Sequence, residues 1–287
     1  MAESHLPIAS IENDFLRLDF FTTTGPRIIG LYARGANGNL LAETPDVHWP
    51  TPHGEFFLRG GHRLMTAPED LFFMGPEDNL QMERSHNTVI LKSPVDASSL
   101  EREITIRLDE NRAHLSHRIT WHGKDEIRFA PWAITQMRMG GMAIVPQSNA
   151  DGLQPNRNLV LWPYTRIHDP RLELNDDLIL LHGKVSAEAC KVGTHTPLGW
   201  LACAMGDALF IKSFEVTAGD FPDQGCNVEV YVKDTCIELE TLGPLKTLKH
   251  GHSVTHSETW QVLTGSYPAT LETARTILRD HSNQDGA

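Results

Sequence analysis

The sequence has no basic cluster, no long apolar run and no export signal. Its 25 lysine and arginine residues are scattered among 37 acidic ones, and the net charge is −12. Nucleic-acid binding needs clustered positive charge, so this class of partner is excluded. No apolar stretch approaches the roughly 20 residues that span a bilayer. The first ten residues, MAESHLPIAS, lack the basic and apolar regions of a signal peptide. We therefore expect a cytoplasmic protein that binds neither nucleic acid nor a membrane.

Cysteine is also scarce, and its spacing is uninformative. Cys190, Cys203, Cys226 and Cys236 form no CxxC pair, which argues against a zinc or redox motif. An even number permits disulfides, but in a protein that is not exported we expect reduced, buried thiols. None of the four lies in a motif that would make it a nucleophile.

Alternating apolar and polar residues dominate what is present. Residues 100–108, 113–121 and 127–137 follow one another as strands separated by polar turns, and similar segments continue to the C-terminal region. The only convincing helix covers about 268–281. Because an open sheet of so many strands would curl or split, the pattern predicts an all-β fold. We expect a large antiparallel β-sandwich forming a single domain over 1–287, with a short C-terminal helix.

One segment, residues 48–82, looks irregular and is rich in proline, glycine, histidine and phenylalanine. Long loops inside compact domains are usually functional. It contains His62 and Arg63 directly after two glycines, which allow a sharp turn or a close approach to a ligand. An arginine can hold a carboxylate or neighbouring hydroxyls, and a histidine can donate a proton near neutral pH. The alternative is a structural loop in which Arg63 pairs with Glu69 or Asp70.

Two carboxylates, Glu238 and Glu240, lie two residues apart on a predicted strand and therefore project from the same face. Carboxylates are costly to bury unless they contact a ligand, a cation or water. This pair predicts a pocket wall or an exposed face.

The segment around Glu240 resembles the C-terminal part of galactose mutarotases, or aldose 1-epimerases. The similarity covers the Leu-Glu-Thr run centred on Glu240 and the later Leu-Lys-x-Gly turn, in which His250 and His252 replace the proline and glutamate of that family. Three pieces, GGHRLMTAPED, APWAITQM and IELETLGPL, more closely resemble an uncharacterised bacterial mutarotase-like family. The resemblance implies the mutarotase supersandwich fold, and a sugar or sugar derivative as the small-molecule partner.

The resemblance also implies site residues. Mutarotation needs a base that removes the anomeric hydroxyl proton and an acid that protonates the ring oxygen. Glu240 matches the base, and Glu238 is either a sugar-hydroxyl acceptor or the base itself. The central segment of mutarotases supplies a histidine as the acid, but APWAITQM contains none. Either His62, His53 or another group replaces it, or the epimerase chemistry is lost. His62 is the replacement we expect, with Arg63 holding sugar hydroxyls.

Three further side chains are candidate sugar ligands. Trp132 and Gln136 lie four apart on one strand, so that the ring could stack on a sugar face while the amide binds hydroxyls. A core tryptophan is the equal alternative. Lys212, in an apolar strand, either binds an acidic sugar or extends its amine to the surface.

A metal site is the weaker reading of the histidines that precede the last strand. His250, His252, His256 and Glu258 would share one face of an extended strand, although Gly251 favours a plain turn. We expect no cofactor and no metal. The sequence does not indicate the oligomeric state. Two functions stay open: an aldose 1-epimerase-like enzyme with a glutamate base, and a non-catalytic carbohydrate-binding sandwich.

Overall fold

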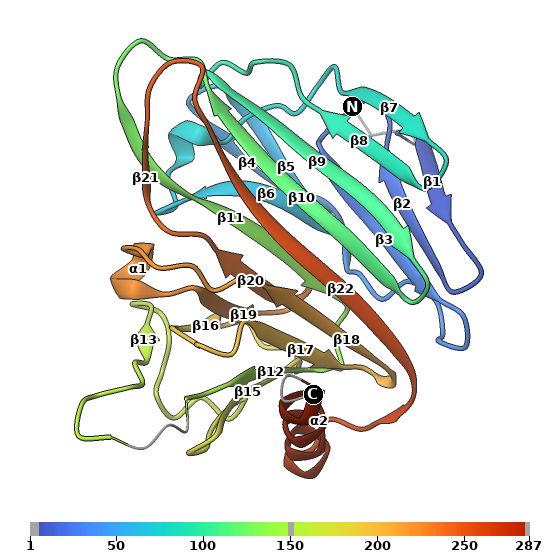
Figure 1. Ribbon diagram of the computed structural model, residues 1–287, viewed down its shortest axis with the longest axis vertical. Coiled ribbons are helices and arrows are strands. Elements are labelled where there is room, and N and C mark those ends of the chain that lie inside the picture. The colour runs from blue at the N-terminus through green and yellow to red at the C-terminus, as the bar shows by residue number, and fades with distance from the viewer. Residues whose placement is uncertain (1–5, 149–151, 285–287) are drawn as a thin grey trace.

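The computed structural model describes residues 6–148 and 152–284, and their main architecture is two large antiparallel sheets packed face to face (Figure 1). The ten strands of the first sheet are, in spatial order, β1 (Ile8–Glu12), β2 (Leu16–Phe21), β3 (Arg27–Ala33), β6 (His62–Ala67), β11 (Ile127–Met137), β20 (Ile237–Leu242), β19 (Val228–Val232), β16 (Cys190–Thr194) and β13 (Val160–Leu161), with β21 (Lys246–Leu248) paired to β11.

The second sheet also has ten strands. In spatial order they are β14 (Leu172–Leu174), β15 (Leu178–His182), β12 (Met142–Pro146), β17 (Trp200–Ala204), β18 (Gly206–Phe214), β22 (Ser253–Tyr267), β10 (Arg112–Trp121), β9 (Leu100–Asp109), β8 (Thr88–Lys92) and β7 (Gln81–Ser85). The remaining elements are the hairpin β4 (Glu43–Thr51) and β5 (Gly54–Gly60), the 3-10 turn η1 (Leu71–Phe73), and the helices α1 (Pro222–Gly225) and α2 (Leu271–Gln284). The predicted antiparallel sandwich with a C-terminal helix is confirmed.

The alternation of residues along each strand builds the core between the sheets. On β9, Ile104 and Ile106 are fully buried, whereas Arg107 between Ile106 and Leu108 is exposed. Phe20 on β2 reaches the same core from the first sheet. All four cysteines are buried as free thiols. Each strand of the first sheet therefore has an inner face toward the core and an outer face turned away from the second sheet.

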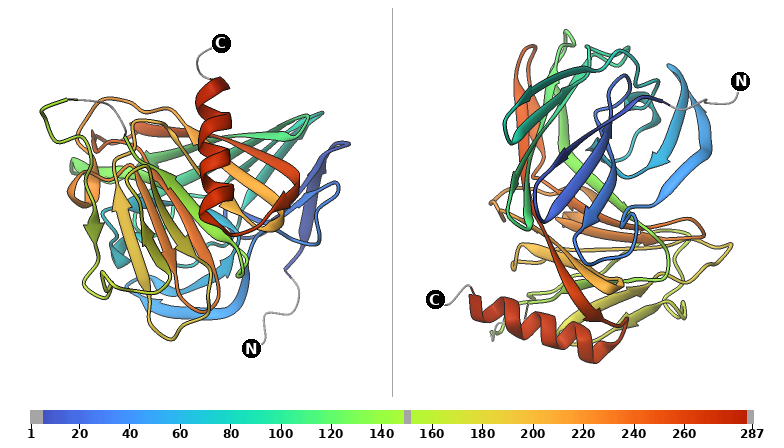
Figure 2. Two further views of the ribbon diagram at one scale, coloured as in Figure 1. Left: turned by 90° about the horizontal axis from the view of Figure 1, so that it is seen from below. Right: turned by 90° about the vertical axis from the view of Figure 1, so that its right-hand side faces the viewer.

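Helix α2 covers the far side of the second sheet, where Ala274 packs in one apolar cluster with Trp200 (Figure 2). It begins at Leu271, three residues later than the predicted range of 268–281. The reason is Thr270, whose hydroxyl accepts the backbone N–H three residues on and so caps the helix. No helix within the described ranges is long and apolar enough to cross a membrane.

The expectation that residues 48–82 form one long loop is wrong. This segment contains the end of β4 and all of β5 and β6. Gly60 and Gly61 make the sharp turn between β5 and β6, with φ angles of 84° and 72°. A Cβ atom on Gly60 would lie 2.1 Å from the carbonyl oxygen of Ala42, and one on Gly61 would lie 2.0 Å from that of Ile28. Only glycine fits this turn, which directs β6 into the first sheet.

Candidate functional site

The outer face of the first sheet brings together five of the seven predicted site residues. In the strand register, Ile134 on β11 is opposite Arg63 on β6 and Glu240 on β20, while Gln136 is opposite Glu238. Directly opposed residues of antiparallel strands project from the same face. The residues that define this outer face are Arg63, Trp132, Gln136, Glu238 and Glu240. Most of them are buried despite being charged or polar.

Glu240 is held by a tryptophan and a lysine. The indole N–H of Trp132 donates to Glu240 Oε2 over 2.7 Å, and Lys191 Nζ lies 2.8 Å from the same oxygen. Lys191 also lies 2.7 Å from Glu229 Oε2 and 4.7 Å from the centre of the Trp132 ring. Burial alone would lower the pKa of Lys191, but Glu240 and Glu229 outweigh it and raise the pKa well above its usual value. Lys191 is therefore a permanent cation between two carboxyl groups.

The bond from Trp132 gives a stability prediction. Replacing Trp132 by phenylalanine keeps most of the apolar contact but removes a donor to a buried carboxylate, which should cost about 1.5–3 kcal/mol. Chemical unfolding followed by circular dichroism measures this loss. Trp49→Phe on β4, in the same outer apolar cluster, is the matched control. Equal losses in the two variants would show that the bond to Glu240 contributes nothing.

Glu238 has its own partners on the outer face. Gln136 Nε2 donates to Glu238 Oε1 over 2.8 Å, and Arg63 Nη2 lies 3.4 Å from that oxygen. Burial raises the pKa of Glu238, and Arg63 partly offsets this effect. Glu238 and Glu240 thus sit in different environments, although they lie two residues apart.

Several buried polar atoms of this face have no hydrogen-bond partner within the described part of the chain. They are Nε and Nη1 of Arg63 and the Oε1 atoms of Gln136, Glu229 and Glu240. Buried polar groups are nearly always paired, and leaving one unpaired costs about 1–3 kcal/mol. These orphaned donors and acceptors lie on four strands of one sheet face, and unpaired polar groups gathered on one face are typical of a site that binds a polar ligand.

His62 and Lys212 do not belong to this face, and both predictions need correction. Neighbouring residues of a strand project to opposite sides, so His62 points into the core while Arg63 points outward. The His62 ring lies between Thr135 Oγ1 at 2.9 Å and His117 Nε2 at 2.8 Å. The expected acid–base pair of His62 and Glu240 is therefore not formed.

Lys212 neither reaches the surface nor lies on the outer face of the first sheet. It is fully buried, and its ammonium group lies 2.9 Å from Glu258 Oε1. It also donates to the carbonyl oxygens of Ala133 on β11 and Leu239 on β20, at 2.8 and 3.1 Å. Lys212 thus ties together, from the core side, the two strands that carry the outer face.

The histidines around Lys212 are neutral links in the same core network. Burial lowers the pKa of His62 and His117, and lowers that of His256 to about 3. His117 Nδ1 donates to the His256 carbonyl, so in the neutral ring its Nε2 accepts from His62. Thr241, the neighbour of Glu240, points inward and bonds to Glu258.

The core network has the geometry of a metal site but already holds its own cation. The ligand atoms of His62, His117 and Glu258 lie within 4.8 Å of one another. A divalent ion there would have to displace Lys212 from Glu258. The set suggested by the sequence is not formed, because His250 and His252 are exposed in the turn before β22 whereas His256 is buried.

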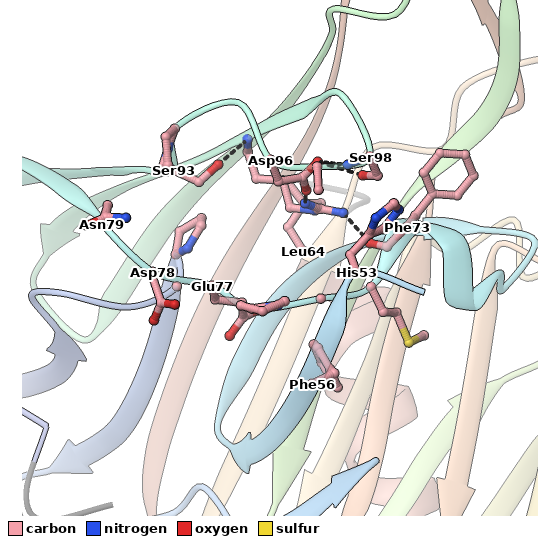
Figure 3. A pocket seen from close by; sticks show the side chains of 18 of the residues that line it. His53, Phe56, Leu64, Phe73, Glu77, Asp78, Asn79, Ser93, Asp96 and Ser98 are labelled. Carbon is pink, nitrogen blue, oxygen red and sulfur yellow. Dashed lines mark hydrogen bonds and ion pairs between the residues drawn. The ribbon is translucent and has the colours of Figure 1, made fainter. Parts of the chain in front are cut away.

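A separate cavity of about 250 Å³ lies beside β6, between the loop after η1 and the turn before β9 (Figure 3). It is lined by His53, Glu77 and Arg102 among others. Glu77 is engaged by Arg27 at 2.9 Å, and Arg102 binds Asp96 at 2.5 Å. His53, the alternative acid, lies here and not among the residues that define the outer face.

Sequence reasoning missed Lys191 and Glu229. Both strands were predicted, and each carries one charged residue among apolar neighbours, in Cys-Lys-Val and Val-Glu-Val. A charge at the centre of a strand that is otherwise apolar was the available signal, because such a charge must find a partner.

Comparison with known solved structures shows the fold of the chain. No protein-family model and no curated protein matches the chain. Among solved structures, a galactose mutarotase-like protein from Lactobacillus casei is 12% identical with a TM-score of 0.54, over 90% of this chain and 100% of that one. A candidate aldose 1-epimerase from Escherichia coli K12 is 12% identical with a TM-score of 0.57, over 90% and 99%.

A TPR-domain containing protein from Parabacteroides distasonis is 10% identical with a TM-score of 0.59, and the match covers 91% of this chain and 47% of that one. The resemblance to galactose mutarotase-like proteins predicted from the sequence is confirmed at the level of the fold.

Proposed function

We propose that the outer face binds a sugar or sugar derivative and interconverts its anomers, with Glu240 as the general base. The observation that carries this proposal is the convergence of unpaired, buried polar atoms from Arg63, Gln136, Glu229 and Glu240. A fold shared with galactose mutarotase-like proteins supports a carbohydrate ligand. Fold alone does not dictate chemistry, so the assignment depends on this set of side chains.

In this proposal each side chain has a part in the reaction. Trp132 and Lys191 both engage Oε2 of Glu240, which leaves Oε1 as the free acceptor for the anomeric hydroxyl proton. Loss of that proton and protonation of the ring oxygen open the ring. The carbonyl carbon then rotates, and the ring closes on the other face. The guanidinium of Arg63 can donate to sugar hydroxyls, and Oε1 of Gln136 can accept from them.

A non-catalytic carbohydrate-binding protein is the second candidate function. The groups that contact the Glu240 carboxylate are Trp132 and Lys191, and neither is a histidine of the kind that mutarotases use as the acid. His62, which we expected to fill that role, faces the core. A pocket without an acid would bind a sugar without converting it.

Exchange NMR between α and β anomers separates the two functions. We expect the protein to accelerate exchange for at least one member of a panel of neutral aldoses, amino sugars and uronic acids. Saturation transfer to a sugar whose exchange is not accelerated would favour the binding protein. Neither acceleration nor saturation transfer for any sugar would rule out both.

A further inference from the structure

We propose that Glu229 is the acid partner of Glu240 and delivers the proton that the ring oxygen receives. The inference rests on the proposed epimerase function. Glu229 is not among the site residues predicted from the sequence, and the histidine that would fill this role in mutarotases has no counterpart on β11.

Glu229 and Glu240 face each other directly. They are opposed in the register of β19 and β20, and opposed residues of an antiparallel pair have Cβ atoms about 4.5–5.5 Å apart. Glu229 is 1% exposed and Glu240 is fully buried. In each carboxyl group, Oε2 contacts Lys191 while Oε1 has no partner among the described residues. The two carboxyl groups are therefore neighbours on one face, and the Lys191 ammonium bridges them.

The charge balance around Lys191 favours a proton on one of the neighbouring carboxyl groups. The single ammonium of Lys191 is close to the carboxyl groups of Glu229 and Glu240, and Asp223 on α1 supplies a third carboxyl group. Buried charges without a counter-charge are costly, so such a group retains protons. Burial raises the pKa of Glu229 well above its usual value; Lys191 opposes this shift, and Glu240 and Asp223 reinforce it.

Asp223 is held beside Glu229 by an unusual backbone. Its φ is 51° and that of Gln224 is 62°, which places two consecutive non-glycine residues in the left-handed region. Such conformations cost about 1–3 kcal/mol each and gather at functional sites. The pKa of Asp223 is also raised by burial. The turn thus keeps a second carboxyl group in place to share the proton of Glu229.

The other proton donors near Glu240 are poorly matched to neutral pH. The pKa of Lys191 is well above its usual value, and burial raises the pKa of the Tyr164 hydroxyl to about 12. The thiol of Cys226, which lies near Glu229, also has a pKa raised by burial. An efficient general acid has a pKa near the working pH, and a carboxylic acid with a raised pKa comes closest to this condition.

In the proposed reaction, the two carboxyl groups act on the two oxygens bonded to the anomeric carbon. Glu240 takes the hydroxyl proton as the carbonyl double bond forms, and the bond between the anomeric carbon and the ring oxygen breaks. The electron pair of that bond goes to the ring oxygen, which takes the proton of Glu229. Ring closure on the other face returns both protons to their original carboxyl groups, so the cycle balances without a cofactor.

The test compares Glu229→Gln, Glu240→Gln and wild type by exchange NMR, after saturation transfer has confirmed that each variant still binds the sugar. Glutamine keeps an oxygen for Lys191 but carries no transferable proton, so Glu229→Gln should lose about 10²–10⁴-fold in rate. Glu103→Gln, a strand glutamate paired with Arg118 on the second sheet, is the control for loss of an ion-paired carboxylate.

The pH profile distinguishes an acid from a merely structural residue. In the wild type, the rate should fall as the pH rises through the pKa of Glu229, because the protonated form is lost. Glu229→Asp should keep this limb at a lower rate, and Glu229→Gln should lose it. If Glu229→Gln retains the wild-type rate while Glu240→Gln loses it, the acid assignment is wrong and the epimerase stands. If the wild type accelerates anomer exchange for no sugar, the acid assignment and the epimerase function are both wrong.

Discussion

Replacement of Lys212 by methionine is expected to lower the free energy of unfolding by about 3–5 kcal/mol. The change removes the only ammonium that lies within salt-bridge distance of Glu258 in the described part of the chain, and it leaves that carboxylate buried. It also removes the bonds that tie β11 to β20 from the core side. Urea unfolding followed by circular dichroism measures the loss.

Two variants make this prediction specific. Lys92→Met breaks an ion pair on a partly exposed lysine and should cost no more than about 1 kcal/mol. The double variant Lys212→Met with Glu258→Gln should recover part of the stability that Lys212→Met loses, because no unpaired charge remains. Similar losses for Lys212→Met and Lys92→Met would contradict the account of the core network.

The largest functional effect is expected at Glu240. Glu240→Gln should slow anomer exchange by about 10²–10⁴-fold while sugar binding persists, because glutamine keeps the shape of the side chain but cannot take a proton. The amide oxygen can still accept from Trp132 and Lys191, so the fold is expected to survive. Exchange NMR at matched sugar saturation measures the rate.

Glu238→Gln is the matched control, because it lies two residues away on the same face and bonds to Gln136 instead of Lys191. We expect weaker sugar binding with the exchange rate at saturation largely retained. Loss of exchange in Glu238→Gln together with normal exchange in Glu240→Gln would move the base to Glu238.

Strand alternation explains which parts of the site were predictable. A period of two placed Glu238 with Glu240, and Trp132 with Gln136, before any contact was known. The same rule excludes a joint role for His62 and Arg63 on one face, since adjacent residues of a strand point apart. That exclusion required knowledge that the segment after the two glycines is a strand, and its proline, glycine and histidine content hid this.

Long-range pairing explains what the sequence could not reveal. Lys212 and Glu258 lie on neighbouring strands of the second sheet, and Lys191, Glu229 and Glu240 come from three strands of the first. Lys191 and Glu229 are each the one charged residue of their strand, and for none of the five does the local pattern say which opposite charge it meets. Only the strand order β20-β19-β16 brings the Lys191 ammonium to both glutamates.

A crystal structure of the protein with a sugar identified by the exchange screen tests the central claim most directly. We predict the sugar on the outer face, with its anomeric hydroxyl within about 3.2 Å of Glu240 Oε1 and other hydroxyls contacting Arg63 and Gln136. A sugar bound instead in the cavity beside His53 and Glu77, with the outer face empty, would contradict the account.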